Sequence, residues 1–355
     1  MSSAQVQIFD GPDISLRSDT IELPHQLETG AVLVEILLAT ICGSDMHTIS
    51  GQRSEPTPLV LGHEAVGRVV AIGGTIDGLA VDDRITWTIA DSCGACSYCK
   101  EYGLPEKCER VFKYGHAPVT DGTGLNGCYA SHIILRPGTT VVKIPVGMPD
   151  AVAAPANCAL STVCNAVSRM PSTIRSAVVQ GAGMLGLYAC AYLKEMGVEH
   201  VFCSDINIER LSLVADFGGI PLDIREESWP VNRANVFRCA PDGVDVVLEM
   251  AGASQLVAQG LELMRTGGYY SFVGMVHPNS PLPVTGEQII RKCVTIQGIH
   301  NYSPVHLQQG IEFLKKTRGH FPYDRLVSPP IPLSRIDEAV ALARTQKFCG
   351  VAVAP

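Results

Sequence analysis

The sequence predicts an α/β protein with two parts, a barrel-like region of short strands and a doubly wound parallel sheet. The first part is indicated by β-rich runs such as residues 31–38 and 66–72, which Gly, Pro and Asp turns separate. The second is indicated by strand-like and helix-like segments that alternate from residue 176 onward. The length of 355 residues suits about two domains.

The first part contains strands joined by turns. Its predicted strands are residues 31–38, 66–72, 84–89, 129–135 and 140–144. Residues 109–127 show no periodicity and are predicted to form a long irregular connection. Residues 150–169 are predicted to form one helix, with Asp150 as its N-cap and Pro155 near its first turn.

The second part alternates between strands and helices. Its predicted strands are residues 176–180, 201–204, 244–250, 268–274 and 294–299. Its predicted helices are residues 185–196, 208–217 and 253–264. Two more helices, at 304–316 and 334–345, precede a terminal β run at 351–353.

The composition excludes several functions. Charged residues make up 17% of the chain and hydrophobic residues 46%, as in a globular protein. The net charge of −8 argues against a nucleic-acid partner. The uncharged stretches 151–168 and 176–193 contain polar residues or clustered glycines, so we expect buried segments rather than membrane spans. No signal peptide is evident, and we expect a cytoplasmic protein.

Four of the thirteen cysteines form a spaced group. Two, two and eight residues separate Cys93, Cys96, Cys99 and Cys108. Four thiolates close a tetrahedral zinc shell with no open position, which is the structural kind of site. Iron–sulfur ligation uses similar spacings, and reactive disulfides are a further alternative. Zinc is favoured because cytosolic thiols stay reduced.

A second group offers ligands of mixed type. Cys42, His63 and Glu64 supply the thiolate, imidazole and carboxylate that hold zinc with one position open to substrate. Ser44 and His47 follow the thiolate in sequence, and they could pass on a proton.

Cys158 is the natural third protein ligand of this second site. It lies four residues before Thr162, so the two would share one face of the predicted helix. Five other positions compete with it for this role, among them Cys128 and Cys164.

A glycine motif indicates a dinucleotide site. Gly181, Gly183 and Gly186 follow a predicted strand and open a predicted helix, and the next strand ends at Asp205, nineteen residues after the last glycine. A carboxylate at Asp205 would bind a ribose 2′-hydroxyl and repel a 2′-phosphate, which favours NAD over NADP. A glycine turn in an unrelated βαβ unit is the alternative. The other expected cofactor contacts are Met184, Leu185, Ala251, Val273 and Gly274.

The two cysteine-containing groups and the glycine motif, in this order along nearly the whole chain, resemble the zinc-dependent alcohol dehydrogenases of the medium-chain dehydrogenase/reductase superfamily. The resemblance implies a GroES-like catalytic domain at residues 1–157 and 299–355 that contains both zinc sites. It also implies an inserted NAD-binding Rossmann domain at residues 158–298. By this resemblance the chain binds two zinc ions, a structural one at the four-cysteine group and a catalytic one at Cys42, His63 and Cys158.

Further roles follow from the same resemblance. Thr162 would lie near the nicotinamide, and Glu64 would lie close to the catalytic metal. Asp45 would orient His63, because a metal-bound imidazole usually donates its second N–H to an acceptor. Ser44 and His47 match the proton relay. The last spacing of the four-cysteine group is eight residues where seven is usual.

Within the family, three segments resemble a bacterial subgroup of alcohol dehydrogenases associated with phosphonate breakdown. They are residues 108–116, 154–160 and 180–186. A phosphonate-bearing alcohol would want cationic contacts, for which the candidates are Arg53, Arg110, Lys113 and His116.

The expected reaction is reversible hydride transfer between a small alcohol and NAD, which gives an aldehyde or a ketone. One rival is a zinc-free reductase of the same superfamily, which would lack both groups of metal ligands. Another is an NAD-binding redox or metal sensor without turnover. We expect a homodimer or a homotetramer, with no nucleic-acid or membrane partner.

Overall fold

The computed structural model describes residues 3–278 and 280–355. Contacts divide the chain into two compact units. The first unit extends to Ser161 and resumes at Tyr302–Arg318 and Tyr323–Pro355, and the second comprises Thr162–Asn301 and Gly319–Pro322. The predicted domain bounds, residues 1–157 with 299–355 and residues 158–298, stay a prediction.

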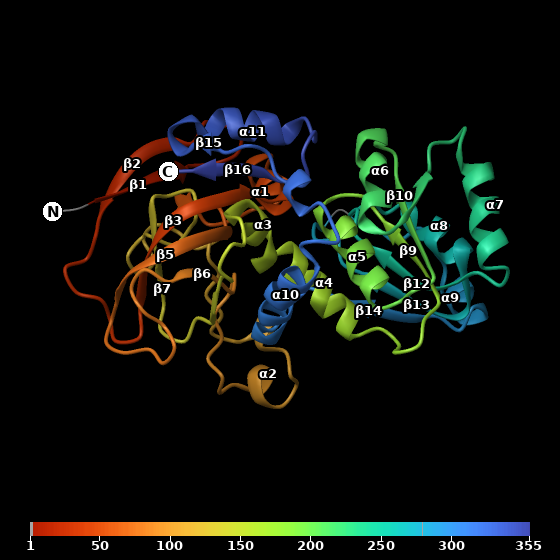
Figure 1. Cartoon of the computed structure of the whole chain (residues 1–355), viewed down its shortest axis with the longest axis horizontal. Coiled ribbons are helices and arrows are strands. Elements are labelled where there is room, and N and C mark those ends of the chain that lie inside the picture. The colour runs from red at the N-terminus through yellow and green to blue at the C-terminus, as the bar shows by residue number, and fades with distance from the viewer. Residues whose placement is uncertain (1–2, 279) are drawn as a thin grey trace. The chain divides into compact units, whose positions relative to one another are not determined.

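The first unit is built on two sheets (Figure 1). A three-stranded sheet has the order β2-β1-β4, and a larger sheet has the order β15-β16-β3-β5-β6-β8, with β7 also paired to β3. The bounds of the strands are β1 Ser3–Phe9, β2 Arg17–Glu22, β3 Val32–Ile41, β4 Leu59–Val60, β5 Glu64–Ile72, β6 Arg84–Trp87, β7 His132–Leu135, β8 Val141–Lys143, β15 Ile331–Pro332 and β16 Val351–Ala354. The helices are α1 Gly43–Ile49, α2 Ser97–Lys100, α3 Asp150–Ala153, α10 Pro304–Thr317 and α11 Ile336–Arg344.

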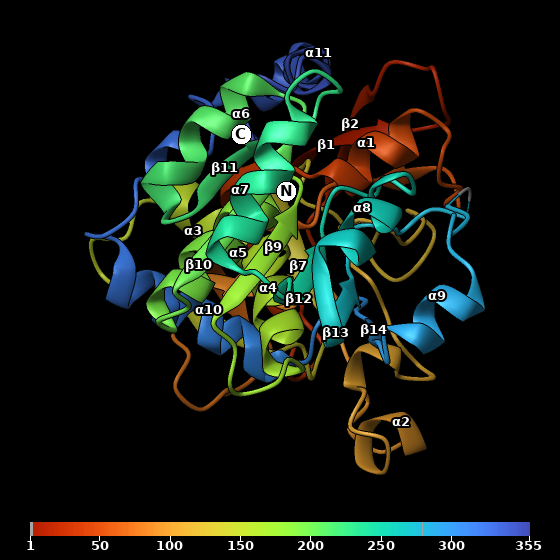
Figure 2. The same cartoon turned by 90° about the vertical axis from the view of Figure 1, so that its right-hand side faces the viewer.

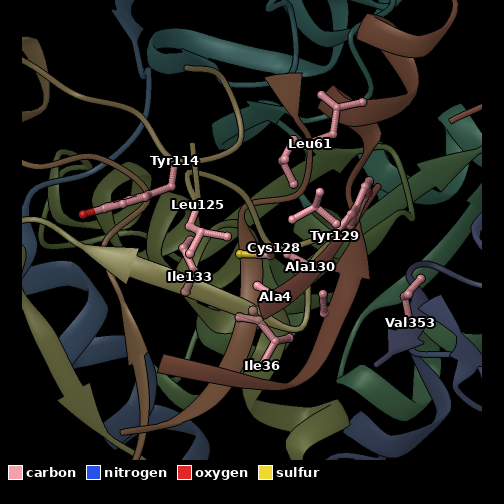
Figure 3. Close-up of a cluster of buried hydrophobic side chains, with 14 of the residues drawn as sticks. Ala4, Ile36, Leu61, Tyr114, Leu125, Cys128, Tyr129, Ala130, Ile133 and Val353 are labelled. Atoms are coloured by element: carbon pink, nitrogen blue, oxygen red, sulfur yellow. The ribbon is translucent and has the colours of Figure 1, made fainter. Parts of the chain in front are cut away.

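Alternating apolar residues of these strands form the core of the first unit. Ala4, Ile36 and Ile133 come from three strands and lie together in the cluster drawn in Figure 3. Val353 adds a side chain from the end of the chain. The barrel-like fold class predicted for this region is confirmed.

The second unit contains a six-stranded parallel sheet of order β11-β10-β9-β12-β13-β14 (Figure 2). This is the doubly wound order, so the predicted Rossmann-type sheet is confirmed. The strands are β9 Ser176–Gln180, β10 His200–Asp205, β11 Ile220–Asp223, β12 Val244–Glu249, β13 Met264–Phe272 and β14 Thr295–Gly298. The helices are α5 Met184–Glu195, α6 Ile208–Val214, α7 Trp229–Cys239, α8 Leu256–Leu263 and α9 Gly286–Arg291. Every residue of β9 is buried, as the central strand of such a sheet requires.

The prediction of one helix over residues 150–169 was wrong. Helix α3 ends at Ala153, a 3₁₀ turn covers Ala154–Asn157, and α4 begins at Ala159 and runs to Ser168. Pro155 explains the break, because it has no N–H to donate to the carbonyl four residues earlier. Asp150 is not the N-cap, which is Pro149, and its carboxylate pairs with Arg84 instead.

None of the described helices is both long enough and apolar enough to cross a bilayer.

Candidate active site

Helix α1 and the residue before it carry four of the predicted site residues. Cys42 is the N-cap of this helix, and its N–H donates to Asp45 Oδ2 at 3.0 Å. The same oxygen accepts the Tyr129 hydroxyl at 2.9 Å. These two donors fix the buried Asp45 carboxylate, so that its other oxygen lies 3.3 Å from His63 Nδ1. Sequence reasoning missed Tyr129, which is remote in the chain.

A tight turn at Gly62, which only glycine can form, precedes His63. The φ of +88° at Gly62 is unfavourable for other residues, and a Cβ at this position would lie 2.5 Å from the Tyr129 ring. The tight turn delivers His63 and Glu64 at the start of β5, where both are buried. Glu64 Oε2 accepts the Thr40 hydroxyl at 2.6 Å. His63 Nε2, on the other side of its ring, lies 3.4 Å from Ser44 Oγ.

Cys158 lies in the irregular step between the 3₁₀ turn and α4, so the argument from a shared helical face with Thr162 does not hold. Asn157 anchors this step, because its side-chain amide donates to the carbonyls of His63 at 2.9 Å and Trp87 at 3.0 Å. The Tyr302 hydroxyl donates to the Asn157 carbonyl. The role of Asn157 could have been predicted from the sequence, because a polar Asn stands in an apolar run directly before Cys158.

The ligand atoms of Cys42, His63, Glu64 and Cys158 all lie within 4.8 Å of one another. The two sulfur atoms are 3.9 Å apart. Sulfur atoms bound to one tetrahedral zinc at 2.3 Å are about 3.8 Å apart, so the geometry of the pair fits this metal. The competing thiols are placed elsewhere, because Cys128 lies in the hydrophobic core of the first unit and Cys164 belongs to the second.

The electrostatics of this cluster favour a cation. The hydrogen bond between the two thiols lowers the pKa of Cys42 well below its usual value and raises that of Cys158, so the pair shares one proton. Burial raises the pKa of Glu64, and the charge of Cys42 adds to this effect. Burial opposes a charge on His63, but the Asp45 carboxylate outweighs it and raises the pKa of His63. A divalent cation would supply the counter-charge for both sulfurs.

The four cysteines around α2 form the second cluster. The sulfur atoms of Cys93, Cys96, Cys99 and Cys108 also lie within 4.8 Å of one another, despite the longer last spacing. The N–H groups of Ala95 and Cys96 each reach Cys93 Sγ at 3.4 Å and lower the pKa of this thiol to about 6. This arrangement of four sulfurs fits a closed tetrahedral metal site.

A group of cationic side chains adjoins the first cluster. Arg53 pairs with Glu55 Oε1 at 2.6 Å, and the same oxygen lies 2.9 Å from His116 Nδ1. The His116 ring packs on that of His63, with centroids 5.2 Å apart. Burial lowers the pKa of Lys113 to about 8, whereas the charges of Cys158 and Cys42 act in the opposite direction. Arg110 is not part of this group, because it is exposed beside Cys93.

The glycine loop of the second unit lies between β9 and α5. Gly181 has a φ of +102°, and a Cβ on Gly186 would lie 1.8 Å from the carbonyl oxygen of Gly181. Asp205, at the end of β10, accepts the N–H of Ala182 at 2.8 Å. Met184 and Leu185 open α5 next to this loop.

Two residues that sequence reasoning missed adjoin the strand ends of the second unit. Arg210 Nε is buried without a hydrogen-bond partner among the described residues, and Arg210 Nη1 lies 3.9 Å from the Cβ position of Gly183. Buried Glu249 accepts the N–H groups of Ala251 at 2.9 Å and Gly274 at 3.2 Å. The predicted contacts Ala251 and Gly274 therefore share one carboxylate, whereas the N–H of Val273 donates to the backbone carbonyl of Glu249 at 3.0 Å. Thr162 is on α4 and is half-buried.

Two protein families match separate parts of the chain. Residues 28–146 match the alcohol dehydrogenase GroES-like domain, and residues 185–316 match zinc-binding dehydrogenase. L-threonine 3-dehydrogenase of Edwardsiella ictaluri is 31% identical over 278 residues, which is 76% of each chain.

Solved structures of alcohol dehydrogenases are also similar to this chain. Alcohol dehydrogenase of Thermotoga maritima is 30% identical over 100% of both chains, with a TM-score of 0.94. Alcohol dehydrogenase of Thermus sp. ATN1 is 27% identical over 99% of both chains, with a TM-score of 0.85. The chain is therefore an oxidoreductase that belongs to the zinc-dependent alcohol dehydrogenase family of the medium-chain dehydrogenase/reductase superfamily.

Proposed function

We propose that this protein oxidises a small alcohol to an aldehyde or ketone, and catalyses the reverse reaction, with a catalytic zinc and NAD. The observation that carries the proposal is the gathering of Cys42, His63, Cys158 and Glu64 within 4.8 Å. Ser44, a hydroxyl without charge, lies beside this cluster at 3.4 Å from His63 Nε2. A purely structural metal site does not require a hydroxyl that can accept and donate a proton beside it.

Cys42, His63 and Cys158 would hold the catalytic zinc, with Glu64 beside it. The four-cysteine cluster would hold a structural zinc. When bound, the catalytic zinc supplies Lewis-acid stabilisation of negative charge on the substrate oxygen, and NAD supplies the hydride acceptor.

The chain's own residues supply a path for the proton. Ser44 Oγ would accept the proton of the substrate hydroxyl as the negative charge forms, and it would pass its own hydroxyl hydrogen on toward His47. His47 follows Ser44 by three residues on α1 and therefore lies on the same helix face. Its Nδ1 lies 2.6 Å from Gln52 Oε1, an acceptor. Nδ1 therefore carries the hydrogen, which leaves Nε2 as the atom that takes a proton and releases it to solvent.

The glycine loop fits a dinucleotide. Gly181, Gly183 and Gly186 leave the backbone at the start of α5 without side chains that would exclude a pyrophosphate. The buried Nε of Arg210, which has no partner in the part of the chain that the structure describes, adds a donor close to the loop. Asp205 would accept the ribose hydroxyls and exclude a 2′-phosphate. Thr162, Met184, Leu185, Ala251, Val273 and Gly274 are proposed as further cofactor contacts.

Asp45→Asn is expected to weaken zinc binding at the catalytic site by about ten- to a hundredfold. The substitution keeps the size of the side chain but removes the charge that holds His63 Nδ1–H. A titration of the zinc-loaded protein with a competing chelator measures the affinity. Asp77→Asn, at an exposed aspartate, is the matched control. Equal zinc retention in both variants would contradict the role of Asp45.

Asp205→Asn is expected to reduce the preference for NAD over NADP by about tenfold or more. Asn retains an oxygen that can accept the N–H of Ala182, but it no longer repels a phosphate. The measurement is kcat/KM for both cofactors at saturating alcohol. Asp242→Asn, a substitution at an exposed residue of the same unit, should not change the ratio of kcat/KM for NAD to that for NADP. An unchanged ratio in Asp205→Asn would show that another residue selects the cofactor.

The substrate class is the finer part of the proposal. The relatives reported above include an L-threonine 3-dehydrogenase and an alcohol dehydrogenase. The resemblance of residues 108–116, 154–160 and 180–186 favours a phosphonate-related alcohol.

The test of the proposed function is an assay with NAD and NADP on simple alcohols, polyols, L-threonine and hydroxyalkylphosphonates. Metal analysis of the same preparation should give about two zinc ions per chain. NAD binding without oxidation of any alcohol would instead support a sensor. Protein without zinc that is still active would support a zinc-free reductase.

A further inference from the structure

Lys113 is a half-buried cation without a counter-ion. Its ammonium has no ion pair and no hydrogen bond among residues 3–278 and 280–355. Burial is the main cause that lowers its pKa to about 8, and the positive charge of Arg53 adds to it. A partly buried ammonium is costly unless something negative compensates it. The fold therefore bears a free-energy cost at this position.

The neighbouring carboxylate does not serve as the counter-ion. Glu55 is the one acid among the four side chains 53, 55, 113 and 116. Its Oε1 atom already binds Arg53 at 2.6 Å and His116 Nδ1 at 2.9 Å. Its charge reaches Lys113 only as a minor contribution to the pKa, behind those of Arg53 and Cys158. The group keeps a net positive charge.

Lys113 also lies close to the proposed reaction centre. The charges of Cys158 and Cys42 both act on its pKa. The backbone of Lys113 forms a β-bridge with Ala90. The neighbouring residue, Ile89, donates its N–H to the Tyr302 hydroxyl. This hydroxyl in turn donates to the carbonyl of Asn157, the residue before Cys158. The Lys113 ammonium is therefore within electrostatic range of both thiols of this cluster.

A second polar atom beside Lys113 also lacks a partner. His116 is 7% exposed, and its Nε2 atom has no hydrogen-bond partner among the described residues. Its Nδ1 atom faces the Glu55 carboxylate, which only accepts, so Nδ1 carries the hydrogen and Nε2 is an acceptor. A cation without a counter-ion and a buried acceptor without a donor therefore stand next to each other.

We propose that the Lys113 ammonium binds an oxyanion of the substrate, a carboxylate or a phosphonate carried on the same short chain as the reacting hydroxyl. The inference rests on the proposed function, because it places the anion next to the alcohol of that reaction. His116 Nε2 would accept a second hydrogen of such a substrate, from a hydroxyl, an ammonium or a monoprotonated phosphonate. Neutral alcohols would leave both groups without partners and would be poorer substrates.

An alternative role for Lys113 is to offset the negative charge of the cysteine thiolates. That role would affect all alcohols equally, because every alcohol uses the same metal. A role in reading the substrate would affect only those that carry an anion. The ratio of kcat/KM between matched anionic and neutral alcohols separates the two roles.

The experiment compares the zinc-loaded protein with Lys113→Met, Lys113→Arg and the exposed control Lys315→Met. The substrates are 2-hydroxyethylphosphonate and 3-hydroxypropanoate against propan-1-ol, and 3-hydroxybutanoate against butan-2-ol. Ethylphosphonate and propanoate serve as inhibitors of neutral-alcohol oxidation. Lys113→Met should lower the anionic-to-neutral ratio by about ten- to a hundredfold, and Lys113→Arg should restore most of it. The comparison of phosphonate with carboxylate identifies the natural anion.

The outcomes separate the inference from the proposed function. A ratio that Lys113→Met leaves unchanged, together with equal inhibition of both proteins by the anions, would overturn the inference and leave the dehydrogenase assignment standing. An equal loss on all substrates would assign Lys113 to the thiolates and would also overturn it. Failure of the unmodified, zinc-loaded protein to oxidise any alcohol would refute the proposed function itself.

Discussion

Cys42→Ser is expected to lower turnover by at least about a thousandfold while NAD binding survives. A serine hydroxyl stays protonated near neutral pH, so it is a poor zinc ligand where a thiolate is a good one. The fold should tolerate the change, because Cys42 is the N-cap of α1 and serine is among the preferred N-cap residues. Steady-state kinetics, zinc content and a titration with NAD measure the three effects.

The control for this variant is Cys293→Ser, at an exposed cysteine of the second unit. It should retain zinc, NAD binding and turnover. Full activity in Cys42→Ser would show that the cluster of Cys42, His63 and Cys158 is not the reaction centre. Loss of NAD binding together with activity would indicate misfolding, which a thermal unfolding curve detects.

Cys99→Ser is expected to remove one of the two zinc ions and to unfold the segment from Cys93 to Cys108. Helix α2 has four residues, none of them buried, so this segment has almost no hydrophobic core of its own. In such small elements the free energy of metal binding is the free energy of folding. Metal analysis should fall from about two zinc ions per chain to about one, and limited proteolysis should cut within the segment.

The catalytic cluster should keep its metal in Cys99→Ser, because its ligands lie at the N-cap of α1, at the turn into β5 and in the step before α4. Cys293→Ser again serves as the matched control. Two zinc ions and an uncut segment in Cys99→Ser would contradict the structural role of the four cysteines. An iron content in place of zinc would favour the iron–sulfur alternative.

The sequence predicted the fold class and most of the strands because their patterns are local. The glycine motif, its flanking strand and the residue Asp205 are close in sequence, and the structure keeps them together. Strand β11 and helix α7 were missed for a local reason as well. Strand β11 has only four residues and contains Pro221, and α7 is polar enough to show little periodicity.

The parts of the site that escaped prediction depend on contacts between residues far apart in the chain. Tyr129 reaches Asp45 across 84 residues, and Tyr302 reaches Asn157 across 145. Nothing near these tyrosines in sequence marks them as supports of the site. The choice of Cys158 over Cys128 and Cys164 had the same difficulty, because it depends on where each sulfur lies in the folded chain.

The pairing of β16 with β3 has a consequence for the order in which the protein is made. Val351 lies opposite Ile41, the residue before Cys42, so this end of β3 is paired with a strand that is synthesised after the whole second unit. The second unit consists largely of one continuous stretch of the chain and can fold while synthesis continues. The end of β3 beside Cys42 must therefore keep an open strand edge until the residues of β16 have been synthesised.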